Sequence, residues 1–282
     1  MQELFIEKFN GILETKKSLV CVGLDPDPGR MPCDNTVEFC VNIIDAVQKH
    51  VSAIKPNLAF FEAMGLDGLG DLKSVLDYVS TRYPDLLVIG DGKRGDIGST
   101  SGQYARAMFE HWGFHAITVN AFAGYDSVKP FLEYRDRGIF VWCKSSNPDG
   151  GQIQDLYVDG SNSERFYQRL ASLISSWDHH GNVGLVVGAT YPDELKNVRQ
   201  LCPEMPFLVP GVGSQSGDLE GSLKAGIGEE NHALLINSSR SIIYASEKID
   251  DYADKASATA RSLNEKIDDT LSDMGRSFIQ TP

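Results

Sequence analysis

The stretch LLVIGDGKRGDIGST, residues 86–100, joins an apolar run to a group of charged residues. Its first part, residues 86–91, is apolar up to a terminal aspartate and has the length of a strand that is buried on both faces. Its second part contains Gly92 and Gly95, which are expected to let the backbone turn tightly. The stretch therefore predicts a buried strand whose carboxyl end carries the chemistry of the protein.

Seven further apolar runs recur along the chain, each followed by a polar loop and a stretch with helical spacing. Continuous apolar strands that alternate with helices indicate parallel pairing through right-handed crossovers. Eight such units predict a (β/α)8 barrel, or TIM barrel, with residues 1–282 as a single domain; an open doubly wound sheet is the alternative. The seven runs are Ser18 to Leu24, Val51 to Lys55, Ala116 to Asn120, Ile139 to Lys144, Val183 to Gly188, Phe207 to Gly211 and Ala233 to Asn237.

The segments between these runs predict helices. Residues 36–50 have apolar side chains at helical spacing, and residues 191–201 begin with a Pro-Asp-Glu turn suited to a helix start. The segment at about 144–182 is long for one strand and helix, and its polar, glycine-rich part predicts a loop at the rim of an active site. The tail beyond Glu247 predicts a closing amphipathic helix.

Composition and charge narrow the class of protein. The net charge is −13 and the basic residues are scattered singly, so we expect no nucleic-acid partner. No apolar run approaches the roughly 20 residues that span a bilayer. Because the N-terminus also lacks the features of a signal peptide, a cytoplasmic protein with no membrane partner is expected. The five cysteines have no metal-binding spacing, which argues against a metal site built from them.

Charged residues follow the second and third strands. Asp91 and Lys93 are two residues apart, so on a strand end they point to the same side. Lys55 ends the neighbouring strand and Asp96 follows shortly, which gives an alternating Lys-Asp-Lys-Asp array in one pocket. The alternative is a surface ion pair beside a glycine turn, which would contribute little. Position at the carboxyl end of a barrel strand favours a functional site.

A second group of residues predicts an anion site. The glycine-rich loop PGVGSQSGD, residues 210–218, can bring backbone N–H groups close to an anion, and NSSR places Arg240 after the eighth strand. The alternative for a single glycine-rich loop is an ordinary flexible connection. Barrel enzymes often hold phosphate after strands 7 and 8, so we expect a small phosphorylated substrate.

These motifs together resemble those of the orotidine 5′-phosphate decarboxylase family, and in particular its longer bacterial subgroup. The pattern D-x-K-x-x-D-I-x-x-T runs from Asp91 to Thr100. The motifs VGLDPDP, AIKPN, SSNP, VVGAT, PGVGSQSGD and NSSRSIIYA occur in the order that the family has them. The resemblance covers nearly the whole chain and implies conversion of orotidine monophosphate to uridine monophosphate and carbon dioxide without a cofactor or a metal.

The resemblance also implies a role for each matching residue. Lys93 would donate the proton, and Asp91 would face the substrate carboxylate. Lys55 and Asp25 would hold the ribose hydroxyls and complete the charged network.

Other matching residues would contribute to the active site of a second subunit or contact the pyrimidine and the phosphate of the substrate. Asp96 and Thr100 would reach into the active site of the neighbouring subunit of a homodimer. The remaining matches would contact the substrate: Ser146, or its neighbour Ser145, at the pyrimidine, Gln215 between base and phosphate, and Arg240 at the phosphate.

Two other functions fit parts of this pattern. Magnesium-dependent aldolases related to hexulose-phosphate synthase share the D-x-K-x-x-D motif, and a non-catalytic nucleotide-binding barrel would keep the fold alone. Lys55, the S-N-P motif and the lack of an obvious acidic metal cluster favour the decarboxylase over the first. The intact Lys93, Asp91 and Asp96 favour it over the second.

Overall fold

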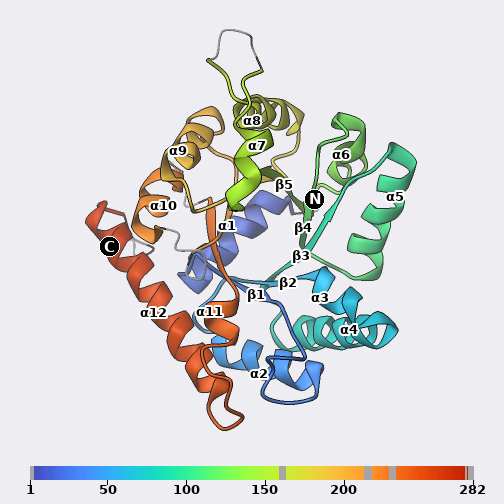
Figure 1. Cartoon of the computed structure of the whole chain (residues 1–282), viewed down its shortest axis with the longest axis vertical. Coiled ribbons are helices and arrows are strands. Elements are labelled where there is room, and N and C mark those ends of the chain that lie inside the picture. Colours follow the sequence, from blue (N-terminus) through green and yellow to red (C-terminus); the bar gives the residue numbers. More distant parts are fainter. Residues whose placement is uncertain (1–2, 159–162, 213–217, 229–232, 277, 279–282) are drawn as a thin grey trace.

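Eight parallel strands form a closed barrel in the computed structural model, which describes residues 3–158, 163–212, 218–228, 233–276 and 278 (Figure 1). Each strand pairs with the next along the chain, and the last pairs with the first through Val20 opposite Ile236. The predicted barrel is confirmed, and the open sheet is wrong. The strands are β1 (Val20–Leu24), β2 (Ala53–Pro56), β3 (Leu87–Arg94), β4 (Ala116–Val119), β5 (Gly138–Lys144), β6 (Val183–Val187), β7 (Phe207–Pro210) and β8 (Leu234–Ser238).

Helices surround the barrel and shield its outer face. The predicted helices at 36–50 and 191–201 correspond to α2 and α9, and the closing helix is α12. The helices are α1 (Phe5–Lys16), α2 (Thr36–Val47), α3 (Leu58–Ala63), α4 (Gly65–Arg82), α5 (Gly98–Arg106), α6 (Tyr125–Leu132), α7 (Gly151–Gln154), α8 (Phe166–Trp177), α9 (Pro192–Leu201), α10 (Leu219–Gly226), α11 (Arg240–Ile243) and α12 (Tyr252–Asp273), with short turns η1 (Ala107–His111) and η2 (Pro148–Gly150).

The long segment after β5 is more ordered than its composition predicts. It contains η2 and α7 near the barrel mouth and then α8, which returns along the barrel to β6. Polar and glycine-rich residues therefore build a short helical rim here, while residues 159–162 lie outside the description. The fold in this segment is set by tertiary contacts, which local composition does not reveal.

Helix α1 packs against the amino-terminal end of the barrel. Phe5 and Phe9 lie with their ring centroids 6.3 and 6.4 Å from that of Phe140 in β5. A Cβ atom at Gly138 would lie 2.2 Å from the Phe5 ring, so only glycine lets the aromatic ring approach this strand. The helix thus adds an aromatic layer beneath the barrel core.

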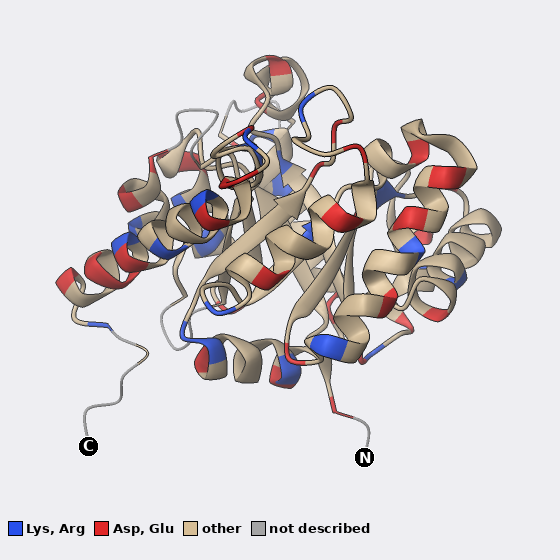
Figure 2. Ribbon diagram, turned by 90° about the horizontal axis from the view of Figure 1, so that it is seen from below, with Lys and Arg blue, Asp and Glu red and all other residues tan. Residues whose placement is uncertain are grey.

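The outer surface carries both signs of charge. Figure 2 shows acidic and basic residues interspersed along the helices, which is the arrangement of a solvated face. None of the described helices combines the length and the apolar composition needed to cross a bilayer.

The buried Arg199 connects α9 to the segments that precede β7 and β8. Arg199 of α9 is only 7% exposed, and its guanidinium donates hydrogen bonds of 2.8 Å to the carbonyl oxygens of Gly226 and Met205. It donates further bonds to the carbonyl oxygens of Cys202, Pro203 and Ala233. The guanidinium also lies 3.6 Å from the centroid of the Phe207 ring. Burial lowers the pKa of Arg199 to about 10, yet the group stays charged at neutral pH.

Replacing Arg199 by leucine should lower the free energy of unfolding by about 2 to 5 kcal/mol, because several buried carbonyl groups lose their donor at once. Urea unfolding of Arg199→Leu against the wild type measures this difference. Arg261→Leu is the control, since Arg261 is exposed and its ion pair with Glu265 spans 3.8 Å. A loss no larger than that of the control would contradict the structural role of Arg199.

Candidate active site

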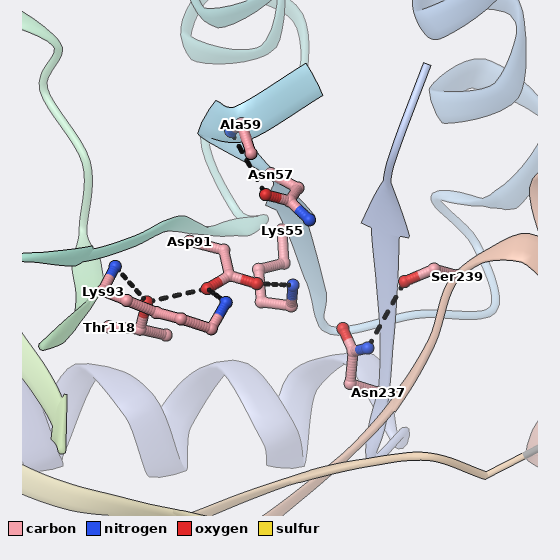
Figure 3. Close-up of polar contacts among 8 residues, drawn as sticks. All are labelled: Lys55, Asn57, Ala59, Asp91, Lys93, Thr118, Asn237 and Ser239. Atoms are coloured by element: carbon pink, nitrogen blue, oxygen red, sulfur yellow. Dashed lines mark hydrogen bonds and ion pairs between the residues drawn. The ribbon is translucent and has the colours of Figure 1, made fainter. Parts of the chain in front are cut away.

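The carboxylate of Asp91 lies between two lysines at the carboxyl ends of β2 and β3 (Figure 3). Its Oδ2 atom accepts a hydrogen bond of 2.5 Å from Lys55 Nζ, and its Oδ1 atom accepts one of 2.7 Å from Lys93 Nζ. Lys55 and Asp91 are buried, whereas the side chain of Lys93 is 44% exposed. The structure therefore brings three of the four residues in the expected charged array together, with one ammonium group open to the barrel mouth.

The electrostatics of this cluster keep its buried members charged. Burial alone would raise the pKa of Asp91, but the ammonium groups of Lys55 and Lys93 outweigh it and hold that pKa well below its usual range. Burial would likewise lower the pKa of Lys55, but the carboxylates of Asp91 and Asp25 raise it. Each buried charge is thus stabilised by its neighbours, and removing Asp91 would leave Lys55 and Lys93 without their shared carboxylate.

A β-bulge in β3 sets the orientation of Asp91 and Lys93. On β3 the register with β4 passes from Gly90 opposite Ile117 to Arg94 opposite Val119, so three residues of β3 face one residue of β4. Lys93 lies inside the bulge and has a φ of 45°, in the left-handed region that lysine rarely adopts. Strained backbone of this kind is concentrated at functional sites.

Gly92 and Gly95, which follow Asp91, differ from the expectation that both let the backbone turn tightly. The residue in the left-handed region is Lys93 and not Gly92, so the expectation that Gly92 supplies the tight turn is wrong. Gly95 is required for a different reason: a Cβ atom there would lie 2.1 Å from the carbonyl oxygen of Asn120. Close approach of two backbones, and not freedom of rotation, explains this glycine.

Thr118 is the residue of β4 that faces the bulge, and none of the sequence motifs indicated it. Its hydroxyl donates a hydrogen bond of 2.8 Å to Asp91 Oδ1 and accepts one of 3.0 Å from the backbone N–H of Lys93. The available signal was a single hydroxyl within the apolar run AITV, one strand away from the D-x-K pattern.

Two buried oxygen atoms near the cluster lack a hydrogen-bond partner among the described residues. They are Asp25 Oδ1, just after β1, and Asn237 Oδ1 in β8. Burial raises the pKa of Asp25, although the charge of Lys55 and hydrogen bonds from Asn57 and Ser239 oppose this. Buried acceptors of this kind are suited to donors supplied by a ligand, such as hydroxyl groups.

A cavity of about 170 Å³ opens above the cluster. Lys55, Asp91, Lys93 and Thr118 form its polar side, and Trp142 of β5 forms another with Ser145, Ser146 and Asn147 of the rim. A larger cavity of about 320 Å³ shares Trp142, Ser145 and Asn147 with it, and its other lining residues include the apolar side chains of Phe122, Cys143, Ile153, Phe166 and Leu170. Because Lys55, Asp91 and Lys93 line the smaller cavity, we take it as the candidate active site.

The two candidate serines differ in their contacts. The Ser145 hydroxyl donates to Asn147 Oδ1 at 2.8 Å, and the Ser145 N–H donates to Gln154 Oε1 at 2.9 Å. Ser145 therefore already uses its hydroxyl and its N–H in hydrogen bonds within the rim. Ser146 is less buried and also lines the cavity, and within the described residues its side chain has no such internal bond, which favours Ser146 as a ligand contact.

A buried ion pair anchors the rim. Lys144 is 2% exposed and pairs with Asp155, just after α7, while its ammonium lies 5.1 Å from the centroid of the Tyr167 ring. Arg165 also approaches Asp155, at 3.5 Å. The ion pair therefore attaches the rim to Lys144, the last residue of β5.

The remaining expected residues lie outside the charged cluster. Asp96 follows β3, and its Oδ1 atom accepts a hydrogen bond of 2.6 Å from the N–H of Ile97. Thr100 lies in α5, and Arg240 is the first residue of α11, directly after β8. Gln215 lies outside the described residues. Across the part of the chain that is described, no three His, Cys, Asp or Glu side chains are placed to share a metal ion.

A closed barrel of eight parallel strands, with a Lys-Asp-Lys cluster at the carboxyl ends of its strands, defines a (β/α)8-barrel enzyme. The chain belongs to the orotidine 5′-phosphate decarboxylase / HUMPS family, whose sequence model matches residues 18–254.

Individual relatives agree with this family. An orotidine 5′-phosphate decarboxylase from Azoarcus sp. (strain BH72) is 44% identical over 270 residues, which is 93% of this chain and 98% of the relative. The structure of Leishmania donovani OMP decarboxylase is 37% identical with a TM-score of 0.83, covering 95% of this chain and 98% of that one. The structure of Leishmania donovani UMP synthase is 38% identical with a TM-score of 0.84, and the match covers 94% of this chain but only 56% of that longer chain.

The raised pKa of Asp25 predicts that this carboxylate destabilises the fold. A carboxyl group with a raised folded pKa contributes stability at low pH that is lost as the pH rises through that pKa. Asp25→Asn should therefore unfold like the wild type near about pH 4 and become the more stable protein towards about pH 8.

Urea unfolding at several pH values measures this difference, with the exposed Asp250→Asn as the control. A difference between Asp25→Asn and the wild type that stays constant with pH would show that Asp25 keeps its ordinary pKa.

Proposed function

We propose that the chain decarboxylates orotidine 5′-phosphate to uridine 5′-phosphate and carbon dioxide, the last step of UMP biosynthesis. The observation that carries this proposal is the buried Asp91 held between Lys55 and the exposed Lys93 inside a barrel-mouth cavity. The relatives named above as decarboxylases cover nearly the full length of this chain, which supports the same activity.

The reaction explains why an ammonium group is needed. Loss of carbon dioxide from C6 of the pyrimidine leaves a carbanion in the plane of the ring, where the ring π-system cannot delocalise it. The stabilising charge must come from the protein. Lys93 would meet the developing negative charge and then protonate C6, which combines preorganised electrostatic stabilisation with general acid catalysis.

Asp91 would act on the substrate carboxylate before it leaves. Two like charges about 4 Å apart repel by roughly 4 kcal/mol at an effective dielectric constant near 20. This repulsion disappears as neutral carbon dioxide forms, so it disfavours the bound substrate relative to the transition state. Since Asp91 is held by Lys55 and Lys93, it can stay ionised when a second carboxylate approaches.

The rest of the substrate would bind away from the reacting carbon. Asp25 and Lys55 would hold the ribose hydroxyls, and the buried Asp25 oxygen without a partner among the described residues supports this. Ser146 would contact the pyrimidine, Gln215 would bridge the base and the phosphate, and Arg240 would bind the phosphate. Binding energy from these distant contacts can be used to position C6 against Lys93.

The active site is proposed to be shared between two chains. Asp96 lies outside the cavity of its own chain, and its neighbour Ile97 is 67% exposed. We propose that Asp96 and Thr100 enter the cavity of a second subunit in a two-fold homodimer. Residues 1–282 would then act as one barrel domain per subunit, with the segment at about 144–182 as the rim.

A magnesium-dependent aldolase is the second candidate, because the matching family includes more than the decarboxylases. Both oxygens of Asp91 already accept hydrogen bonds from ammonium groups, which suits a metal-independent cluster better than a cation site. Following the loss of orotidine monophosphate absorbance with and without a chelator separates the two. Decarboxylation that needs added magnesium would contradict the proposed cofactor-free reaction.

Lys93→Ala should lower turnover by at least about a thousandfold, or roughly 4 kcal/mol in transition-state free energy, because the lost ammonium acts mainly in the transition state. Binding of uridine monophosphate, measured by calorimetry, should change far less. Turnover within about tenfold of the wild type would rule out Lys93 as the proton donor.

A mixture of two inactive proteins tests the shared site. When Lys93→Ala and Asp96→Ala chains are unfolded together and refolded, about half the dimers should be mixed, and each mixed dimer has one intact site. About a quarter of wild-type activity should therefore return.

The matched control mixes Lys93→Ala with Lys55→Ala. Both residues serve the site of their own chain, so no intact site can form and no activity should return. Failure of the first mixture to recover activity, with mixed dimers shown by mass spectrometry, would place Asp96 in the site of its own chain.

A further inference from the structure

The bulge in β3 replaces backbone pairing with a single side chain. Between Gly90 and Arg94, three residues of β3 face only Thr118 of β4, so the regular ladder of hydrogen bonds is interrupted there. Thr118 is 3% exposed and its hydroxyl occupies this gap. The two functional groups of the bulge, Asp91 and Lys93, are both bonded to it (Figure 3).

The Thr118 hydroxyl donates one hydrogen bond and accepts another, and each goes to a different residue of the bulge. Its one proton is donated to Asp91 Oδ1, and an oxygen lone pair accepts the backbone N–H of Lys93. The same Asp91 oxygen accepts the ammonium of Lys93. One hydroxyl therefore connects the backbone of Lys93, the carboxylate of Asp91 and, through that carboxylate, the end of the Lys93 side chain.

We propose that Thr118 is a positioning residue for the decarboxylation: its hydroxyl holds Lys93 in the left-handed conformation that directs the ammonium toward the reacting carbon. A lysine at a φ of 45° relaxes toward ordinary backbone unless its surroundings prevent this. The bond from the Lys93 N–H to Thr118 is the contact that opposes such relaxation on the β4 side.

The role of Thr118 differs from that of a residue that only fills the core. Its methyl group can be replaced without loss of either hydrogen bond, whereas its hydroxyl cannot. Removing the hydroxyl leaves the Lys93 N–H and one oxygen of Asp91 short of a partner while the apolar packing is kept. The effect should then appear in the chemical step and not in the binding of a product that lacks the departing carboxylate.

The test compares Thr118→Val, which keeps the shape and loses the hydroxyl, with Thr118→Ser, which keeps the hydroxyl. Thr118→Val should lower turnover by about 10- to 100-fold, because small displacements of a catalytic group have effects of this size. Thr118→Ser should restore turnover to within about threefold of the wild type. The dissociation constant of uridine monophosphate should stay within about threefold in both variants.

Three results would overturn the proposal: unchanged turnover in Thr118→Val, a Thr118→Ser variant as slow as Thr118→Val, or a loss of product affinity equal to the loss of turnover. Should Thr118→Val not fold, Thr118→Cys takes its place. Its thiol is a much weaker hydrogen-bonding group in nearly the same volume, so the turnover of Thr118→Cys should fall clearly below that of Thr118→Ser, and equal turnover in these two variants would overturn the proposal.

This inference rests on the proposed decarboxylase activity, and the two fail separately. A wild-type protein that does not convert orotidine monophosphate contradicts the proposed function. A wild-type protein that converts it, together with a Thr118→Val variant that converts it equally well, contradicts only the role of Thr118.

Discussion

The pairing of buried Asp91 with two lysines is the constraint on which the rest of the site depends. A carboxylate at this depth needs opposite charges and hydrogen bonds around it, since an uncompensated buried charge is costly. Lys55 supplies one charge from the neighbouring strand, and Lys93 supplies the other from the same strand. To reach back to Asp91 from two residues away, Lys93 takes a left-handed backbone within a bulge, and that bulge in turn needs Thr118.

The charged cluster and the aromatic packing lie at opposite ends of the barrel. The cluster lies at the carboxyl ends of the strands, where barrels place function, and the aromatic layer of Phe5 and Phe9 lies at the opposite end. Stability is thus supplied by apolar packing and by the buried Arg199, while the charged cluster and the left-handed Lys93 lie at the mouth. Such a division lets the site depart from ideal geometry without weakening the barrel as a whole.

Much of this arrangement could be predicted from the sequence because it follows from local patterns. Eight buried apolar runs alternate with helical segments, and the confirmed barrel has a strand at each of them. The proximity of Lys55 and Asp91 follows from their places at the ends of neighbouring strands, whereas the contact between Lys93 and Asp91 depends on the bulge. The bulge could not be predicted, because nothing in the run from Leu86 to Asp91 signals that β3 continues to Arg94. The partner of Asp96 likewise depends on a second chain, about which a single sequence holds no geometric information.

The left-handed backbone of Lys93 also bears on how this position changes over evolutionary time. Glycine adopts a φ of 45° at no steric cost, and asparagine does so more readily than lysine. The backbone conformation therefore favours other residues at position 93, and the lysine is retained for its ammonium group. In a duplicated copy released from selection for the reaction, position 93 should be among the first of the barrel to change, with Lys55 left as the opposite charge beside Asp91.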